Sequence, residues 1–444
     1  MPAYDRDEPL LPEPPEFLPF LRTMLVPPPG EEKDNPYLIY NTWQEVAAHG
    51  ASIMDPVAGP DEAVSARARE LSTGLESFRD RFEALARFVQ GSRYVSIQLD
   101  LAKGGGMVPT APGEVLRCNY GDCKDKANLL RALLAEVGIP SYAVIINSSG
   151  PREQVPVDWP SAGWFNHCIA AIAVPDDYQA EAVMEHPQLG RLLIFDPTDK
   201  YTPPGEISPG EYGGRYLVLS PLTDSLGELP DLAPQLNRVE NRLEGTLTQD
   251  GNVTASLEHV AYGLEARMLR WKNALTSASD MEDYIRNRLT MDKSSITVSD
   301  LEVQVPEDTL QFRFKLKLEA PMHARSVGNQ LLVFKPCIIR RRDWIPPTEE
   351  RLNPIKIPSV SFSEIARIHL PENYEVDEEL ANASLEESFA SYSCTQRVEE
   401  GCLVLERRLE LREALLPRED YERVVSFYRQ LVDVENTPVV LKRQ

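Results

Sequence analysis

Apolar residues after Cys123 recur at intervals of three and four, which predicts an α-helix with one buried face. Asp122 stands directly before this pattern and is expected to be the N-cap. Gly138 and Pro140 are expected to end the helix, so Cys123 would lie in its first turn. The residues of the predicted buried face are Ala127, Leu130, Leu133, Leu134 and Val137.

Two further apolar runs predict short buried strands, and each has a polar residue at one end. His167 lies at the start of the apolar run in residues 164–174. Asp196 ends the run that begins at residue 192, and Pro197 follows as a turn residue. Short apolar runs bounded by turn residues are typical of strands in a protein core.

Beyond residue 236 the apolar positions alternate, which is typical of strands with one buried face. Asp250 and Gly251 predict the turn of a hairpin within residues 243–260. Helical spacing occurs instead in residues 262–274, 279–290 and 418–434. The other alternating segments are residues 296–305, 310–318, 330–335, 365–370, 388–398 and 402–412.

The chain is strongly acidic, with 46 Lys and Arg residues, 69 Asp and Glu residues and a net charge of −23. This balance argues against nucleic acid or anionic lipid as a partner, because both require clustered basic residues. No apolar run approaches the roughly 20 residues of a membrane span. The first residues also lack the pattern of a secretory signal. We therefore expect a cytoplasmic protein, or a periplasmic or exported one if the chain is a fragment of a longer precursor.

The predicted place of Cys123 favours a nucleophilic thiol. Unpaired N–H groups and the positive end of the helix dipole stabilise a thiolate in the first turn, and they could also stabilise an oxyanion. Asp122 and Asp125 place negative charge beside the sulfur, and Lys124 and Lys126 offset it only in part. The helix alone therefore leaves open an ordinary half-buried cysteine.

The order Cys123, His167, Asp196 is that of a thiol acyl-transfer triad. In these roles Cys123 attacks, His167 is the general base and acid, and Asp196 orients the imidazole. The sulfur and an imidazole nitrogen should then lie within or near hydrogen-bond reach.

The sequence around these residues resembles the three catalytic blocks of the transglutaminase-like superfamily, which has a papain-like fold. The blocks are GDCKDKANLLRALLAEVGIPSYAVII, FNHCIAAIAV and LLIFDPTDKYTPPG. The bacterial multidomain members, which join this core to β-rich domains, are the most similar. The resemblance covers residues 40–225 best and implies that Cys123, His167 and Asp196 are catalytic. Tyr94 lies near a family position and is a candidate second donor to the oxyanion.

Together, the patterns and the resemblance predict an α+β fold with three parts. Residues 1–36 contain ten prolines and are expected to be an arm or linker. Residues 37–228 would form the papain-like transglutaminase core. Residues 236–444 would form a β-sandwich-like region of one or two subdomains.

A zinc site is the alternative for the cysteines, with Cys118, Cys123, His167 and Cys168 as possible ligands. Adjacent residues of a strand point to opposite faces, so His167 and Cys168 cannot both face one site. We therefore expect no metal and no cofactor, and we expect Cys118 and Cys168 to be small apolar fillers. Three histidines appear isolated in the sequence and are expected to be structural: His259, His323 and His369.

The expected reaction is acyl transfer from an amide of a protein or peptide, through a thioester on Cys123, to water or an amine. Residues 104–112 and 201–214 would line the cleft as Gly- and Pro-rich loops. Glu206 and Glu211 lie in the second loop, and Glu114 follows the first. Flexible, hydrated walls favour hydrolysis, although these carboxylates could also attract a cationic amine. The alternative from another class is a non-catalytic module that binds a protein or peptide.

Overall fold

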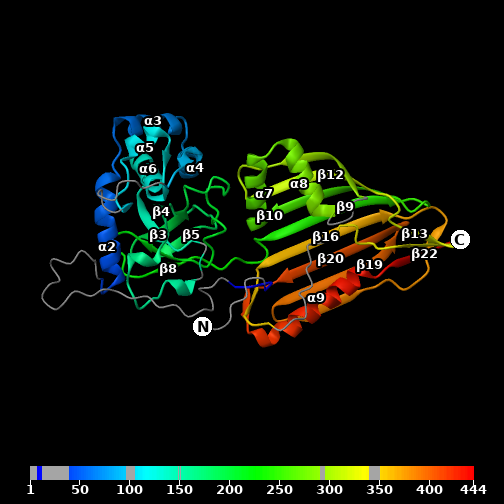
Figure 1. Ribbon diagram of the computed structural model, residues 1–444. Helices are drawn as coiled ribbons and strands as arrows, with labels where there is room; N and C mark the ends of the chain where they lie inside the picture. Colours follow the sequence, from blue (N-terminus) through cyan, green and yellow to red (C-terminus); the bar gives the residue numbers. More distant parts are fainter. Residues whose placement is uncertain are drawn as a thin grey trace. The chain divides into compact units, whose positions relative to one another are not determined.

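The chain forms two units, Pro14–Asp231 (the N-terminal unit) and Leu232–Gln444 together with Met1–Glu13 (the C-terminal unit) (Figure 1). The mixture of helices and strands confirms the α+β class. No helix in the described part of the chain is long and apolar enough to cross a bilayer. The computed structural model describes residues 8–12, 40–96, 106–148, 150, 152–290, 296–339 and 351–444.

The N-terminal unit contains a six-stranded antiparallel sheet in the order β5-β6-β4-β3-β7-β8. The central strands β3 and β4 consist largely of Ala, Val and Ile, which suit a sheet buried on both faces. A separate parallel pair, β1 (Arg93–Tyr94) and β2 (Tyr120–Gly121), places Tyr94 opposite Gly121, which lies two residues before Cys123 in the sequence. The strands of the sheet are β3 (Ser141–Ile146), β4 (His167–Ala173), β5 (Val183–His186), β6 (Gly190–Phe195), β7 (Arg215–Val218) and β8 (Gly227–Glu228).

Helix α6 (Cys123–Glu136) is buried on all sides, which corrects the expectation of one buried face. It contacts β3 and β4 on one side and helices α3, α4 and α5 on others (Figure 1). Its polar residues have protein partners in place of water: Lys126 Nζ donates to Ser92 O at 2.9 Å, and Asn128 to Met54 O at 3.1 Å. The other helices of the unit are α2 (Trp43–Met54), α3 (Glu62–Ser72), α4 (Phe78–Gly91) and α5 (Pro112–Cys118).

The C-terminal unit is organised around one eight-stranded sheet in the order β11-β12-β10-β9-β16-β20-β19-β18. Helices α7 (Gly263–Leu275) and α8 (Ala278–Thr290) contact β10 to β12, and α9 (Tyr421–Asn436) contacts β18 and β19 (Figure 1). Helices therefore pack on part of the eight-stranded sheet. In a simple β-sandwich, a second sheet would cover that surface instead. The strands are β9 (Arg238–Leu247), β10 (Val253–Tyr262), β11 (Thr297–Gln304), β12 (Gln311–Ala320), β16 (Val360–His369), β18 (Ala383–Glu387), β19 (Ala390–Glu399) and β20 (Cys402–Leu411).

Two smaller sheets complete this unit. A four-stranded sheet has the order β13-β14-β22-β17, and β15 pairs with β21. Leu332 and Leu441 of the four-stranded sheet join the same hydrophobic core as the large sheet. The strands are β13 (Arg325–Val327), β14 (Leu331–Phe334), β15 (Ile355–Ile357), β17 (Tyr374–Val376), β21 (Ala414–Leu416) and β22 (Val439–Arg443).

Residues 8–12, within the proline-rich arm, contact the C-terminal unit. Lys356 N donates to Leu10 O at 2.7 Å, and Arg351 donates to Pro9 O at 2.5 Å. The Glu8 carboxylate accepts two backbone N–H groups, from residues 352 and 353. This part of the arm therefore belongs to the C-terminal unit. Most of the arm lies outside the described residues, as does Arg340-Arg341-Arg342, a basic stretch that the sequence predicts to be a solvated loop.

Candidate active site

Cys123 is the first residue of α6, and a reciprocal capping box fixes the start of this helix. The Asp122 carboxylate accepts the Asp125 N–H at 3.2 Å, and the Asp125 carboxylate accepts the Asp122 N–H at 3.2 Å. Lys124 forms ion pairs with both carboxylates, so their charge beside the sulfur is partly neutralised. The half-buried thiol thus lies at the positive end of the helix dipole.

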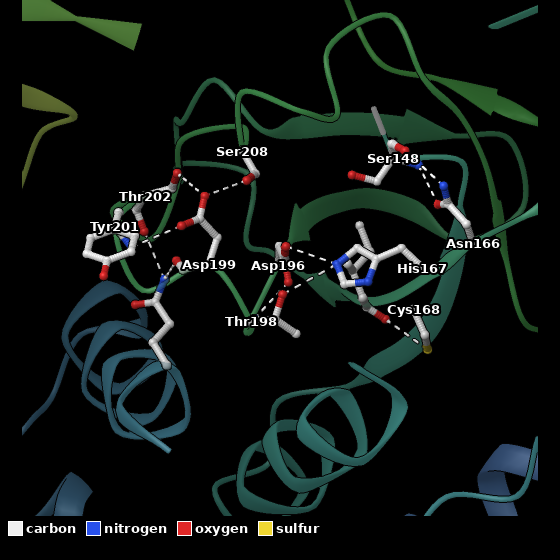
Figure 2. A network of polar contacts seen from close by, with 12 residues as sticks. Ser148, Asn166, His167, Cys168, Asp196, Thr198, Asp199, Tyr201, Thr202 and Ser208 are labelled. Carbon is white, nitrogen blue, oxygen red and sulfur yellow. Dashed lines mark hydrogen bonds and ion pairs between the residues drawn. The ribbon is translucent and has the colours of Figure 1, made fainter. Parts of the chain in front are cut away.

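His167 and Asp196 meet because their strands are antiparallel neighbours. His167 is the first residue of β4, and Asp196 directly follows β6. The register pairs Ala170 with Phe195, which brings both polar residues to the same edge of the sheet. His167 Nε2 lies 3.0 Å from Asp196 Oδ2 (Figure 2). Since this carboxylate oxygen accepts, Nε2 carries the proton and Nδ1 remains for the thiol.

Thr198 holds the other oxygen of Asp196. Its N–H donates to Asp196 Oδ1 at 2.7 Å, and its hydroxyl lies 3.5 Å from His167 Nε2 (Figure 2). Burial alone would raise the pKa of Asp196, but the bonds to His167 and Thr198 outweigh burial and lower it. Asp196 is therefore an anion that is held in one orientation.

Burial lowers the pKa of His167, but its contacts with Asp196 and Cys123 outweigh burial and raise this pKa to about 10. Cys123 thus lies close enough to the imidazole to affect its protonation. Tyr94 also contacts the Cys123 side chain, and burial followed by the charge of Cys123 raises the pKa of its phenol. The site therefore joins a thiol, an imidazole and a carboxylate in one chain of contacts, with a neutral hydroxyl beside the thiol.

A cavity of about 700 Å³ lies beside Cys123 and His167. Asp122 and Lys124 contribute polar groups near the thiol. Much of the remaining lining is apolar, and part of it comes from one face of α2. The apolar side chains along the cavity are Val46, Ile53, Met54, Met107, Ile145, Phe165 and Leu219.

Among the described residues, the four possible ligands of the alternative zinc site do not form a group that could hold a metal ion. In the described part of the chain, the one group of three potential ligand atoms within 4.8 Å of one another is His167, Asp196 and Glu211. Cys168 is buried, as expected of an apolar filler, and burial raises its pKa. Cys118 is not a filler, because it is only partly buried and its sulfur donates to Glu114 Oε1 at 3.2 Å.

Glu211 was wrongly expected on a hydrated cleft wall. Its side chain is 2% exposed, and one of its carboxylate oxygens lies near Asp196 and His167. No pattern in the Gly- and Pro-rich sequence around it distinguishes this carboxylate from a solvated one. Its partners come from residues distant in sequence.

His369 of the C-terminal unit is not isolated, which corrects a second expectation. Its Nδ1 lies 3.2 Å from Cys402 Sγ, and its Nε2 lies 3.0 Å from Glu244 Oε1. The pairing of β16 with β20 places His369 directly opposite Cys402. Cys402 is 3% exposed, so a substrate has little access to its sulfur. This thiol is therefore less accessible than the half-buried thiol of Cys123.

Comparisons with known proteins support the fold but assign no activity. Residues 329–441 match a family described as "Domain of Unknown Function with solved-structure structure (DUF3858)". A crystal structure described as a "putative protease" from Parabacteroides distasonis is similar, with a TM-score of 0.51 and 11% sequence identity. The similarity covers 91% of this chain and 59% of that protein. No protein with a curated description matches the chain. At 11% identity the similarity establishes a shared fold over most of this chain.

Proposed function

We propose that the chain is a cysteine hydrolase or acyltransferase of transglutaminase-like type, with a papain-like catalytic core in its N-terminal unit. The observation that carries this proposal is the chain of contacts from Cys123 through His167 to Asp196, at the wall of a substrate-sized cavity. The fold shared with a protein described as a "putative protease" is consistent with it.

In the proposed acylation, Cys123 Sγ transfers its proton to His167 Nδ1 and attacks the carbonyl carbon of an amide. The carbonyl oxygen gains negative charge, which the first-turn N–H groups of α6 and the Tyr94 hydroxyl would stabilise. His167 then returns the proton to the leaving nitrogen as the C–N bond breaks. The products are a thioester on Cys123 and an amine or ammonia.

Deacylation reverses the role of His167. The imidazole takes a proton from an attacking water or primary amine, the C–S bond breaks, and the proton returns to Cys123. Because Cys123 is partly exposed, water can reach a thioester there, and we propose hydrolysis as the main outcome. The buried position of Glu211 removes one of the carboxylates that had suggested hydrated walls.

The cavity suggests which amides are bound best. The apolar face of α2, with Val46, Ile53 and Met54, would contact the side chain of the substrate nearest the reacting carbonyl. Transfer of such a side chain from water contributes roughly 1.5–3 kcal/mol. We therefore propose a protein or peptide substrate with a large apolar residue on the acyl side.

Paired peptide substrates test the reaction and its acceptor. Peptides with Leu or Glu on the acyl side, and a glutamine peptide, would be incubated with the protein and a dansylated amine. Cleavage or ammonia release without amine incorporation supports hydrolysis, whereas stoichiometric incorporation identifies a transferase. Cys123→Ala should abolish either reaction, and Cys118→Ala is the matched control that should retain it. Failure of the native protein on every peptide would count against the proposal.

A further inference from the structure

Glu211 is a buried carboxyl group for which the proposed mechanism has no role. One of its oxygens lies within 4.8 Å of a ring nitrogen of His167 and a carboxylate oxygen of Asp196. Oε1 is buried and has no hydrogen-bond partner among the described residues. The backbone fixes this position from both sides, because Glu211 N donates to Ser208 O at 2.8 Å and Gly214 N donates to Glu211 O at 2.9 Å.

The absence of a side chain at residue 214 is part of this arrangement. A Cβ at Gly214 would lie 2.8 Å from the backbone oxygen of Glu211, which is closer than real contacts allow. Any other residue would therefore shift Glu211. The local backbone therefore holds the Glu211 carboxyl group close to Asp196.

The groups that face Glu211 are mostly acidic. They are Asp196, His167 and Asp199. The Asp199 carboxylate is already bound to the hydroxyl groups of Thr202 at 2.8 Å and Ser208 at 2.7 Å (Figure 2). Within the described residues, no Lys or Arg forms an ion pair with Glu211.

Two lysines lie nearby, and the charge of Lys126 interacts with that of Asp196. Lys126 donates to Ser92 O, and burial lowers its pKa to about 8 although Asp196 opposes this shift. Lys200 lies near Lys126. Two buried carboxylates so close together, with no donor to Glu211 Oε1 among the described residues, are costly to ionise at the same time.

We propose that Glu211 is a positioning residue that keeps its proton at neutral pH and donates it in a hydrogen bond to Asp196. This inference rests on the proposed function for its role in the reaction. Asp196 would then be held by three donors: Thr198 N–H, His167 Nε2–H and the Glu211 hydroxyl. Burial and the charge of Asp196 raise the pKa of Glu211 well above its usual value, and the pKa of Asp196 is lowered, which agrees with this placement of the proton.

A neutral Glu211 also suits the proton transfers of His167. An ionised Glu211 would place a second negative charge beside the imidazolium and oppose transfer of its proton to the leaving amine. The hydrogen bond from the neutral acid orients Asp196 without adding charge.

Two variants separate the hydrogen bond from the charge. Glu211→Gln keeps a donor of similar shape but cannot ionise, whereas Glu211→Leu removes the donor at similar volume. Glu185→Gln is the control, because the Glu185 side chain is 78% exposed. Circular dichroism would verify that each variant folds.

Infrared difference spectroscopy gives the first measurement, which does not depend on activity. We expect the carbonyl band of a protonated carboxylic acid in the native protein at pH 7, its loss in Glu211→Gln, and its retention in Glu185→Gln. Absence of the band from the native protein would overturn the proposal. A band that is present while Cys123 is inert would support the proton on Glu211 and overturn the proposed function instead.

The rate of Cys123 alkylation by iodoacetamide gives the second measurement. We expect Glu211→Gln to remain within about twofold of native and a folded Glu211→Leu to be at least about tenfold slower. Equal rates for native and Glu211→Leu would overturn the positioning role. Stoichiometric Zn²⁺ binding that removes the infrared band and requires Glu211 would also overturn it, because the three groups would then be metal ligands.

Discussion

At the scale of single residues, the charge of Asp196 controls the proposed nucleophile through His167. Asp196 Oδ2 accepts a hydrogen bond from His167 Nε2, with 3.0 Å between the two atoms. This bond leaves Nδ1 available to Cys123. The raised pKa of His167, about 10, makes its imidazole a strong base for the proton of Cys123 in the proposed reaction. An uncharged partner at position 196 would remove both effects.

Asp196→Asn should therefore lower the rate of Cys123 alkylation and of peptide cleavage by at least about 100-fold, because the amide neither stabilises the imidazolium nor fixes its tautomer. Thr198→Val is the matched control, since it removes the hydroxyl at 3.5 Å but keeps the N–H that binds Asp196. We expect this control to stay within a few fold of native. Equal losses in both variants would mean that the charge of Asp196 is unimportant.

Glu211→Gln should change how stability depends on pH. The folded pKa of Glu211 is raised above its usual value of 4.5, so above this pH the unfolded chain releases a proton that the folded chain keeps. Native stability is then lost as the pH rises, by up to about 1.4 kcal/mol per pH unit. The free energy of unfolding of Glu211→Gln relative to native should thus increase from pH 4 to pH 7. A difference that is constant with pH, measured by urea unfolding, would contradict the retained proton.

The sequence identifies some of these residues and not others for a physical reason. Cys123, His167 and Asp196 each lie at the end of a predictable helix or strand. The same local pattern therefore predicts both their positions and their roles. Glu211 lies in a turn-rich stretch, and its burial depends on contacts with Asp196 and His167 that local patterns do not encode. The same holds for the contact of His369 with Cys402 across two strands.

At the scale of elements, the start of α6 sets the position of the thiol. Its capping box uses Asp122 and Asp125, and the Asp122 side chain is also paired with the buried Lys124. Loss of Asp122 therefore removes a cap and the nearer partner of a buried ammonium group.

Two cap variants test this element. Asp61→Ala removes the cap of α3, where the carboxylate accepts the Val64 N–H at 2.9 Å, and should cost about 1 kcal/mol of stability. Asp122→Ala should cost more, because Lys124 keeps only the Asp125 carboxylate at 3.8 Å. Only Asp122→Ala should alter the rate of Cys123 alkylation. A comparable change in both variants would show that the rate follows overall stability rather than the cap.

Element prediction succeeds where a periodic pattern is long enough. Helices α7 and α8 lie close to their predicted ranges, as do the long strands β10, β11, β12, β19 and β20. Strands β9 and β16 begin five residues before their predicted starts at residues 243 and 365. Helix α5, with seven residues, was missed. Strands β15 and β21 were missed as well, because each has three residues and exists through pairing with the other, more than fifty residues away.

At the scale of the whole molecule, segments far apart in the sequence contact one another within the C-terminal unit. Strand β9 pairs in parallel with β16, so residues 238–246 lie beside residues 361–369. Residues 8–12 add a contact from the other end of the chain, through Glu8 and the nearly buried Arg351. These contacts could not be predicted from periodicity, because no local pattern specifies a partner so far along the chain.

Glu8→Ala should destabilise the C-terminal unit by about 1–3 kcal/mol, because the N–H groups of Leu352 and Asn353 lose their acceptor. Thermal unfolding measures this loss, and Glu185→Ala serves as the exposed control. Cys123 alkylation should be unchanged, since the arm contact belongs to the other unit. An unchanged unfolding profile would contradict the arm contact.

The competition between Cys123 and Cys118 for iodoacetamide tests the central claim most directly. Both sulfurs are partly exposed, but a bond to Glu114 raises the pKa of Cys118, whereas Cys123 has His167 to take its proton. Peptide mapping by mass spectrometry at pH 7 should find Cys123 modified at least about tenfold faster in the native protein, with the difference lost in His167→Ala. Equal modification of the two cysteines in the native protein would contradict the proposed nucleophile.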